Sequence, residues 1–76
     1  MDRDRVLVVE DDDFTRAMLI SSLKLEGLDV VGDSATVRGA INIMETLKPD
    51  IAIIDLHLGA GPTGLECLSG AYHCGR

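Results

Sequence analysis

The sequence predicts an α/β protein with a parallel sheet, and three observations lead to this fold class. Two short apolar runs, residues 6–9 (VLVV) and 51–54 (IAII), lack the polar alternation of half-exposed strands, which is typical of strands covered on both faces. Two amphipathic helical patterns lie between these runs, on either side of a third short apolar segment, residues 28–31. Crossovers of about 10 to 15 residues between the strands indicate right-handed β-α-β units.

The first helix is expected to begin at Asp12 or Asp13, because either carboxylate can cap the free N–H groups of a helix start. Gly27 is expected to end this helix, since glycine readily takes the left-handed conformation that stops one. The apolar side chains that support the helix are Phe14, Met18, Leu19, Ile20 and Leu23.

Gly27 and Gly32 bound the predicted middle strand, residues 28–31. The second helix is expected to start near Ser34 or Thr36 and to end at Lys48-Pro49, because proline cannot continue a helix. One face of this helix is apolar and is interpreted as core, with the residues Val37, Ala40, Ile41, Met44 and Leu47.

The third strand, residues 51–54, leads into Asp55 and then into a glycine-rich loop, residues 59–64. Residues 65–68 are expected to form the first turn of a third helix. Residues 69–76 show no clean apolar stripe and contain two glycines, so they are expected to be frayed.

Composition narrows the possible functions. The 76 residues are 46% hydrophobic, too apolar for a disordered acidic tail, and 13 acidic against 7 basic side chains give a net charge of −6. This charge disfavours direct binding to nucleic acid and to anionic membranes. The charged start and the short apolar runs predict neither signal peptide nor membrane span, so a cytoplasmic location with reduced cysteines is expected.

Acidic side chains follow the first and third predicted strands. Glu10 and Asp11, with Asp12 and Asp13 behind them, leave the first strand, and Asp55 leaves the third. Carboxyl ends of parallel strands share one edge of a sheet, where two carboxylates about 4 Å apart repel by roughly 4 kcal/mol at an effective dielectric of 20. An all-oxygen cluster suits a hard cation, best Mg²⁺, whereas capping explains Asp13 fully.

Three segments together resemble the receiver domain of two-component response regulators. They are residues 6–12 (VLVVEDD), 27–32 (GLDVVG) and 48–56 (KPDIAIIDL), and the resemblance spans residues 5–68. It implies a flavodoxin-like sheet that accepts a phosphoryl group on one aspartate, with Mg²⁺ bound beside it. The implied donors are a sensor histidine kinase or a phosphotransfer protein, and the domain itself is not an enzyme.

Matched by position, the resemblance makes Asp55 the phosphoacceptor and one of the metal ligands. Glu10 and Asp11 take the places of the acidic pair at Mg²⁺, with Glu10 replacing the commoner aspartate. The backbone carbonyl of His57 would complete the ligand set of the ion.

The resemblance also implies that residues 1–76 are a partial receiver domain, with residues 69–76 as an atypical tail. The family pattern continues through further helices and two more strands, which carry a Ser or Thr and a Lys that contact the phosphoryl group. We therefore expect a truncated domain with strand order 2-1-3, lacking the last two strands and helices, and with impaired phosphorylation. The open edge of the third strand would drive formation of a homo-oligomer.

Alternatives from other classes stay open. The chain could be a receiver-like interaction fragment without phosphoryl chemistry, or an aspartate-dependent phosphohydrolase, although Glu10 stands where that nucleophile belongs. The loop at residues 59–64 fits G-x-G-x-x-G, but no acid follows about 20 residues later, as a dinucleotide site requires. A zinc site is disfavoured because its candidate ligands fit no usual spacing: His57, Cys67, His73 and Cys74.

Overall fold

Strands and helices alternate through residues 4–57 and 67–74, which are the residues that the computed structural model describes. The elements in chain order are β1 (Arg5–Glu10), α1 (Asp13–Leu25), β2 (Asp29–Ser34), α2 (Val37–Leu47), β3 (Ile51–His57) and β4 (Cys67–His73). The type and order of the first five elements are those predicted from the sequence, and the α/β fold class is confirmed.

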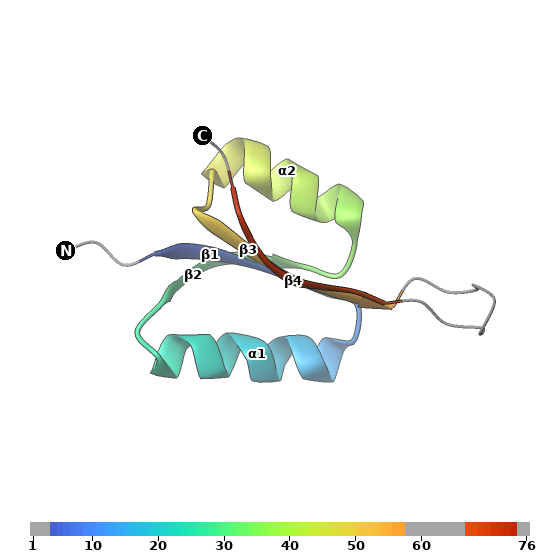
Figure 1. Ribbon diagram of the computed structural model, residues 1–76, viewed down its shortest axis with the longest axis horizontal. Helices are drawn as coiled ribbons and strands as arrows, with labels where there is room; N and C mark the ends of the chain where they lie inside the picture. The colour runs from blue at the N-terminus through green and yellow to red at the C-terminus, as the bar shows by residue number, and fades with distance from the viewer. Residues whose placement is uncertain (1–3, 58–66, 75–76) are drawn as a thin grey trace.

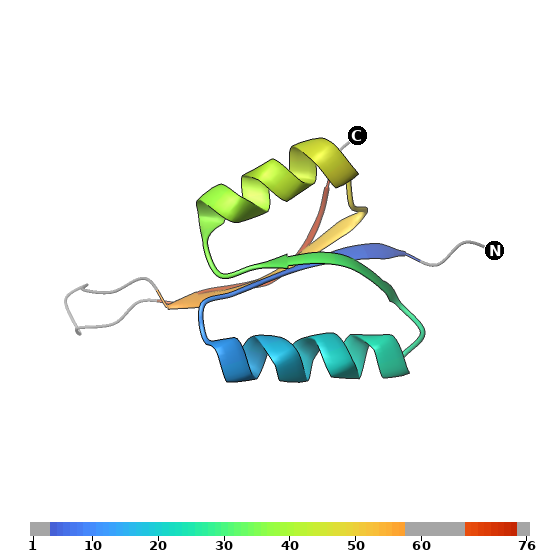
Figure 2. The same ribbon diagram turned by 180° about the vertical axis from the view of Figure 1, so that it is seen from behind.

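A four-stranded sheet in the order β2-β1-β3-β4 forms the middle layer. β1 is one of its two inner strands and pairs in parallel with β2 on one side and with β3 on the other. α1 lies on one face and α2 on the opposite face (Figure 1), and the reverse view gives the same arrangement (Figure 2). The predicted order 2-1-3 is therefore confirmed for the first three strands, and cover on both faces explains the unbroken apolar run in β1.

β4 differs from what the sequence led us to expect. It pairs antiparallel with β3 over the whole strand, from Cys67 opposite His57 to His73 opposite Ile51. The expected open edge of the third strand is wrong, because β4 occupies that edge. The predictions of a helical turn at residues 67–68 and of fraying at 69–74 are also wrong. The predicted loop at residues 59–64 and the first part of that turn lie outside the described residues.

The pairing of β4 has a physical cause that local sequence patterns do not contain. An unpaired edge of β3 would leave a row of backbone N–H and C=O groups without partners. Gly70 has φ of +150°, a conformation that glycine adopts readily and that is incompatible with a helix. Beyond the strand, the Cys74 N–H donates to the Asp50 carbonyl at 2.8 Å. Self-association of the chain stays a prediction, but the open edge of β3, on which that prediction was based, is occupied by β4.

α1 begins and ends where local chemistry directs it. The Asp12 carboxylate caps the helix by accepting a hydrogen bond from the Thr15 N–H at 2.8 Å. At the other end Gly27 has φ of +89°, a conformation that favours glycine, and its N–H donates to the Lys24 carbonyl at 3.0 Å. Both predicted limits are thus confirmed, with Asp12 as the capping residue.

α2 is capped by Thr36, whose Oγ1 accepts a hydrogen bond from the Gly39 N–H at 3.0 Å. It ends at Lys48, which has a left-handed φ of 49° and precedes Pro49. The strand before it, β2, continues through Gly32 instead of ending there. A side chain at Gly32 would come within 3.0 Å of Ile43 Cγ2, so the glycine lets α2 approach the strand closely.

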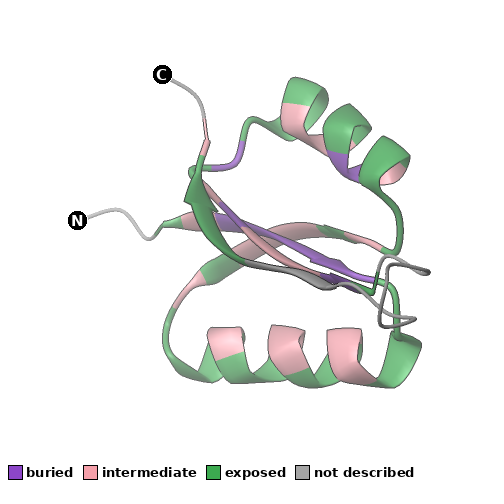
Figure 3. Ribbon diagram, turned by 45° about the vertical axis from the view of Figure 1, so that its right-hand side comes forward, coloured by how far each residue is buried: buried purple, intermediate pink, exposed green. Residues whose placement is uncertain are grey.

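The main core cluster lies between the sheet and α2, and Figure 3 shows buried residues both in the sheet and on α2. Its buried members share this layer and are Leu7, Val9, Ala40, Ala52 and Leu56, with Ile43, Met44, Ile54 and Cys74 packed against them. The predicted apolar face of α2 is only partly buried, because Val37 and Ile41 are exposed. On α1, Phe14 is 73% exposed, so neither helix buries its whole apolar stripe.

Neither helix in the described part of the chain combines the length and apolar character that a membrane crossing needs.

Candidate functional site at the carboxyl edge of the sheet

The carboxyl ends of β1 and β3 bring the predicted site residues to one edge of the sheet. Glu10 is the last residue of β1 and lies directly opposite Asp55 of β3 in the parallel register. Asp11 follows β1, and His57 ends β3. Side chains alternate between the two faces of a strand, so Asp55 and His57, two residues apart, share the face that Glu10 also uses. Two pairs of residues that are distant from each other in sequence thereby meet at a single edge.

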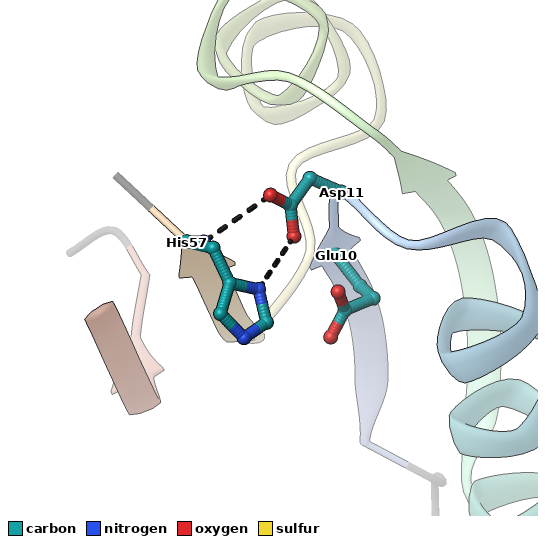
Figure 4. Close-up of side chains that lie close together, drawn as sticks. All are labelled: Glu10, Asp11 and His57. Atoms are coloured by element: carbon teal, nitrogen blue, oxygen red, sulfur yellow. Dashed lines mark hydrogen bonds and ion pairs between the residues drawn. The ribbon is translucent and has the colours of Figure 1, made fainter. Parts of the chain in front are cut away.

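Asp11 and His57 bind one another through two contacts (Figure 4). His57 Nδ1 lies 3.1 Å from Asp11 Oδ1, and the His57 backbone N–H donates to Asp11 Oδ2 at 3.3 Å. The hydrogen bond with His57 lowers the pKa of Asp11. The same hydrogen bond, with the nearby negative charge, raises the pKa of His57. The pair thus holds the ends of β1 and β3 together and favours the charged form of each group.

Glu10 is the buried acid of the site, with 0% of the residue exposed. Its Oε2 accepts a hydrogen bond from the Asp12 N–H at 2.9 Å. Its Oε1 is buried and has no hydrogen-bond partner within residues 4–57 and 67–74. Burial raises the pKa of Glu10, and the neighbouring Asp11 and Asp55 raise that pKa further. One oxygen of a buried carboxylate is therefore left for a proton or a cation.

Asp12 and Asp13 have structural partners. The Asp12 carboxylate accepts a hydrogen bond from the Thr15 N–H, and this bond lowers the pKa of Asp12. Asp13 forms an ion pair with Arg16 at 2.7 Å. Arg16 also pairs with Asp33 at 3.1 Å and donates to the Glu10 carbonyl at 2.9 Å. These contacts fasten the start of α1 to β1 and β2, and they leave Glu10 and Asp11 as the acids that face the site from β1.

Three of these residues could hold a divalent cation. One ligand atom from each of Glu10, Asp11 and His57 lies within 4.8 Å of the other two. Together with the unpartnered Glu10 Oε1, this grouping fits the cation that the acidic residues predict. Asp11, Asp12, Thr15 and His57 line an open hollow of about 460 Å³ beside them, so the site is accessible from solvent.

The His57 side chain is a participant that the sequence reasoning missed, because only its backbone carbonyl was expected at the ion. Its position two residues after Asp55, at the end of a strand, was the available signal. The disfavoured zinc set is not brought together. His57 and His73 lie near opposite ends of the β3–β4 pair, since His57 is opposite Cys67 and His73 is opposite Ile51.

The fold and the site together define a class: an α/β domain with a mostly parallel sheet and an acidic cluster that could hold a cation where the first and third strands end. The family model for the response regulator receiver domain matches residues 6–70. The chain therefore belongs to the response regulator receiver family, as the sequence motifs predicted.

Curated relatives agree with this assignment. The transcriptional regulatory protein PdtaR of Mycobacterium tuberculosis is 35% identical over 71% of this chain and 26% of its own length. The chemotaxis protein CheY of Thermotoga maritima is 38% identical over 68% of this chain and 43% of its own length. The response regulator GacA of Pseudomonas aeruginosa is 36% identical over 82% of this chain and 29% of its own length.

In each of these alignments the chain covers less than half of the relative, between 26% and 43% of its length. No solved structure gives a significant match to the chain.

Proposed function

We propose that the chain accepts a phosphoryl group on Asp55 from the phosphohistidine of a sensor kinase or phosphotransfer protein, with Mg²⁺ at Glu10 and Asp11. The observation that supports this role best is the register of β1 and β3, which sets Asp55 directly opposite Glu10. Membership of the receiver family gives the class of reaction. The expected cytoplasmic location belongs to the same proposal.

The transfer exchanges one bond to phosphorus for another. The P–N bond to the donor histidine breaks, and an Asp55 carboxylate oxygen forms the new P–O bond. The electron pair of the broken bond stays on the donor nitrogen. When bound, Mg²⁺ offsets negative charge on the phosphoryl oxygens during the transfer. The chain's own acids, Glu10 and Asp11, would hold this ion, with the His57 backbone carbonyl as the further ligand expected from the family.

The lysines of the chain bear on the speed of transfer. Lys24 and Lys48 are its two lysines, in the last turn of α1 and at the end of α2. A helix that connects two parallel strands runs antiparallel to them. Its carboxyl end therefore lies at the edge of the sheet where the strands begin, away from the edge where they end. Neither lysine is therefore beside Asp55 to neutralise a phosphoryl group, and we propose that transfer is slow.

The test is incubation of the purified chain with acetyl phosphate and Mg²⁺, followed by intact-mass measurement. We expect the mass of one added phosphoryl group, lost in Asp55→Asn. Asp29→Asn is the matched control, because Asp29 is an exposed acid at the start of β2 and should leave the gain unchanged. A folded chain that gains no mass, or a gain that survives in Asp55→Asn, would contradict the proposal.

The positions of the lysines also support a second candidate, a receiver-like interaction domain without phosphoryl chemistry. A chain of this kind would bind a histidine kinase but show no mass gain with any phosphodonor. Binding to a kinase that is equal for the original chain and Asp55→Asn would favour this candidate over the phosphoacceptor.

A further inference from the structure

Glu10 and Asp11 each have one carboxylate oxygen that accepts a hydrogen bond from a backbone N–H. Glu10 Oε2 accepts from the Asp12 N–H at 2.9 Å, and Asp11 Oδ2 accepts from the His57 N–H at 3.3 Å. The remaining oxygens are Glu10 Oε1 and Asp11 Oδ1. The backbone thus holds both carboxylates in place before any ion arrives, which lowers the ordering cost of binding one.

Glu10 Oε1 points to a ligand independently of the acidic cluster. It belongs to a residue with 0% exposure and has no hydrogen-bond donor in the described part of the chain. Leaving a buried polar atom without a partner costs about 1–3 kcal/mol, and more when the group is charged. A cation at this oxygen would remove that cost.

The His57 ring completes the set with a nitrogen. Its Nδ1 lies 3.1 Å from Asp11 Oδ1. Two ligand atoms that share one ion, each about 2.1 Å from it at an angle of 90–109°, are about 3.0–3.4 Å apart. The His57 side chain is 54% exposed, so the ring has room to turn toward Glu10 Oε1. The ligand atoms of Glu10, Asp11 and His57, which lie within 4.8 Å of one another, could then come together around one ion. Figure 4 shows the ring and the two carboxylates gathered at the strand ends.

We propose that Glu10, Asp11 and the imidazole of His57 form a site for a first-row transition-metal ion, with His57 Nδ1 as a direct ligand. Imidazole nitrogen suits ions such as Co²⁺, Ni²⁺ and Zn²⁺, whereas Mg²⁺ is held by oxygen. The ring therefore contributes affinity for the transition metal and none for Mg²⁺. The same two carboxylates, Glu10 and Asp11, serve the Mg²⁺ site of the proposed function. The proposed transition-metal site rests on that function only in that a cation binds at these carboxylates.

The first test compares Co²⁺ and Mg²⁺ affinities of the original chain and His57→Gln by titration calorimetry. Loss of a direct ligand should weaken Co²⁺ binding at least about tenfold, because even outer-shell changes cost about 10- to 100-fold. Mg²⁺ affinity should stay within about twofold, a difference below 0.5 kcal/mol. His73→Gln is the matched control, because His73 is the other histidine and lies at the far end of β3–β4.

The second test reads the ligand atom directly and needs no variant. The chain has two histidines, so ¹⁵N-histidine labelling gives two sets of ring signals. Addition of Zn²⁺ should shift the Nδ1 signal of His57 at one equivalent and leave the ring signals of His73 unchanged. Mg²⁺ should leave the nitrogen signals of both rings in place.

Two results would overturn the inference. One is Co²⁺ affinity that is equal in the original chain and His57→Gln, and the other is a Zn²⁺ shift confined to His73. Phosphorylation of Asp55 with Mg²⁺, measured by mass in the original chain, separates the two proposals. A mass gain with unchanged Co²⁺ affinity would defeat the nitrogen ligand alone, whereas reduced Co²⁺ affinity without a mass gain would defeat only the phosphoacceptor.

Discussion

Glu10 links the stability of the domain to the chemistry of its site. It places an ionisable side chain in a fully buried position beside Asp11 and opposite Asp55. Burial and the neighbouring acids raise the pKa of Glu10, so the folded chain holds this proton more tightly than the unfolded chain. The stability contributed by the protonated form is full below about pH 4.5 and is lost as the pH rises through the raised pKa.

Glu10→Gln should therefore stabilise the chain at neutral pH in the presence of a chelator. The amide keeps the acceptor for the Asp12 N–H and replaces a buried negative charge with a donor group, for a gain of about 1 kcal/mol. The gain should shrink toward zero as the pH falls below about 4.5, where Glu10 is protonated too. Urea unfolding at several pH values measures the difference in free energy.

The control for this prediction is Glu45→Gln, the same change at an exposed position on α2. Its free energy of unfolding should follow that of the original chain at every pH. A Glu10→Gln chain that is less stable than the original at pH 7 would show that the buried carboxylate is not strained without a cation.

Residue roles could be predicted from the sequence to the extent that each role has a local signal. Asp12 and Asp13 both satisfy the rules for a helix cap, and only the geometry assigns the cap to Asp12 and the Arg16 ion pair to Asp13. The proximity of Glu10, Asp11 and Asp55 followed from the rule that parallel strands share a carboxyl edge. The His57 ring could not be placed, because its contact with Asp11 depends on a side-chain rotamer.

At the scale of an element, the helices depend on a few hydrogen bonds at their ends. Thr36 caps α2 through Oγ1, which accepts from the Gly39 N–H. Thr36→Ala should destabilise the chain by about 1 kcal/mol, because the Gly39 N–H then has no side-chain partner. Thermal or urea unfolding monitored by circular dichroism measures this change.

Thr46 offers a matched comparison within the same helix. Its hydroxyl donates back to the Asn42 carbonyl at 2.9 Å, a bond that competes with the helix instead of capping it. Thr46→Ala should leave stability unchanged or raise it by a few tenths of a kcal/mol. If the two alanine variants lose equal stability, the loss cannot be assigned to the cap.

Element limits were predictable where the chemistry is local, as at Asp12, Gly27, Thr36 and Pro49. The end of β2 was not, because glycine at position 32 reads as a boundary in sequence. In the structure the same glycine lies inside the strand, where it makes room for Ile43 of α2. The contact between β2 and α2 requires glycine at position 32, and a local sequence pattern gives no information about such a contact.

At the scale of the whole molecule, β4 closes the outer edge of β3. The Cys74 N–H donates to the Asp50 carbonyl, so alternate residues of β4 direct their N–H groups toward β3, and Tyr72 is one of them. Tyr72→Pro should remove a bond of the ladder and destabilise the chain by about 1–3 kcal/mol. Urea unfolding measures the loss.

Ala71→Pro is the matched control, because the N–H of Ala71 faces away from β3 by the same alternation. It should cost less than Tyr72→Pro, and Tyr72→Ala reports the loss of the side chain alone. Equal effects of the two proline variants would mean that β4 contributes little to stability through its pairing with β3.

β4 shows what the sequence could not supply. Residues 67–74 carry a weak local pattern, and their partner strand is known only once β3 has a free side. The parallel order of β2, β1 and β3 followed from the crossovers between them, whereas the antiparallel return depends on the sheet as a whole.

The edge opposite the acidic site joins three strands through Asp50. Its N–H donates to the Arg5 carbonyl at 2.8 Å, its carboxylate accepts from the Arg5 N–H at 2.9 Å, and its carbonyl accepts from the Cys74 N–H at 2.8 Å. The first residue of β1 and the residue after β4 meet here, at the edge of the sheet where β1 begins and β4 ends (Figure 1). A mechanical pull applied through residues 4 and 74 would load these bonds first and peel the strands apart from this edge. Tension on the chain would therefore open the sheet at Asp50 while the ends of β1 and β3 at Glu10 and His57 were still joined.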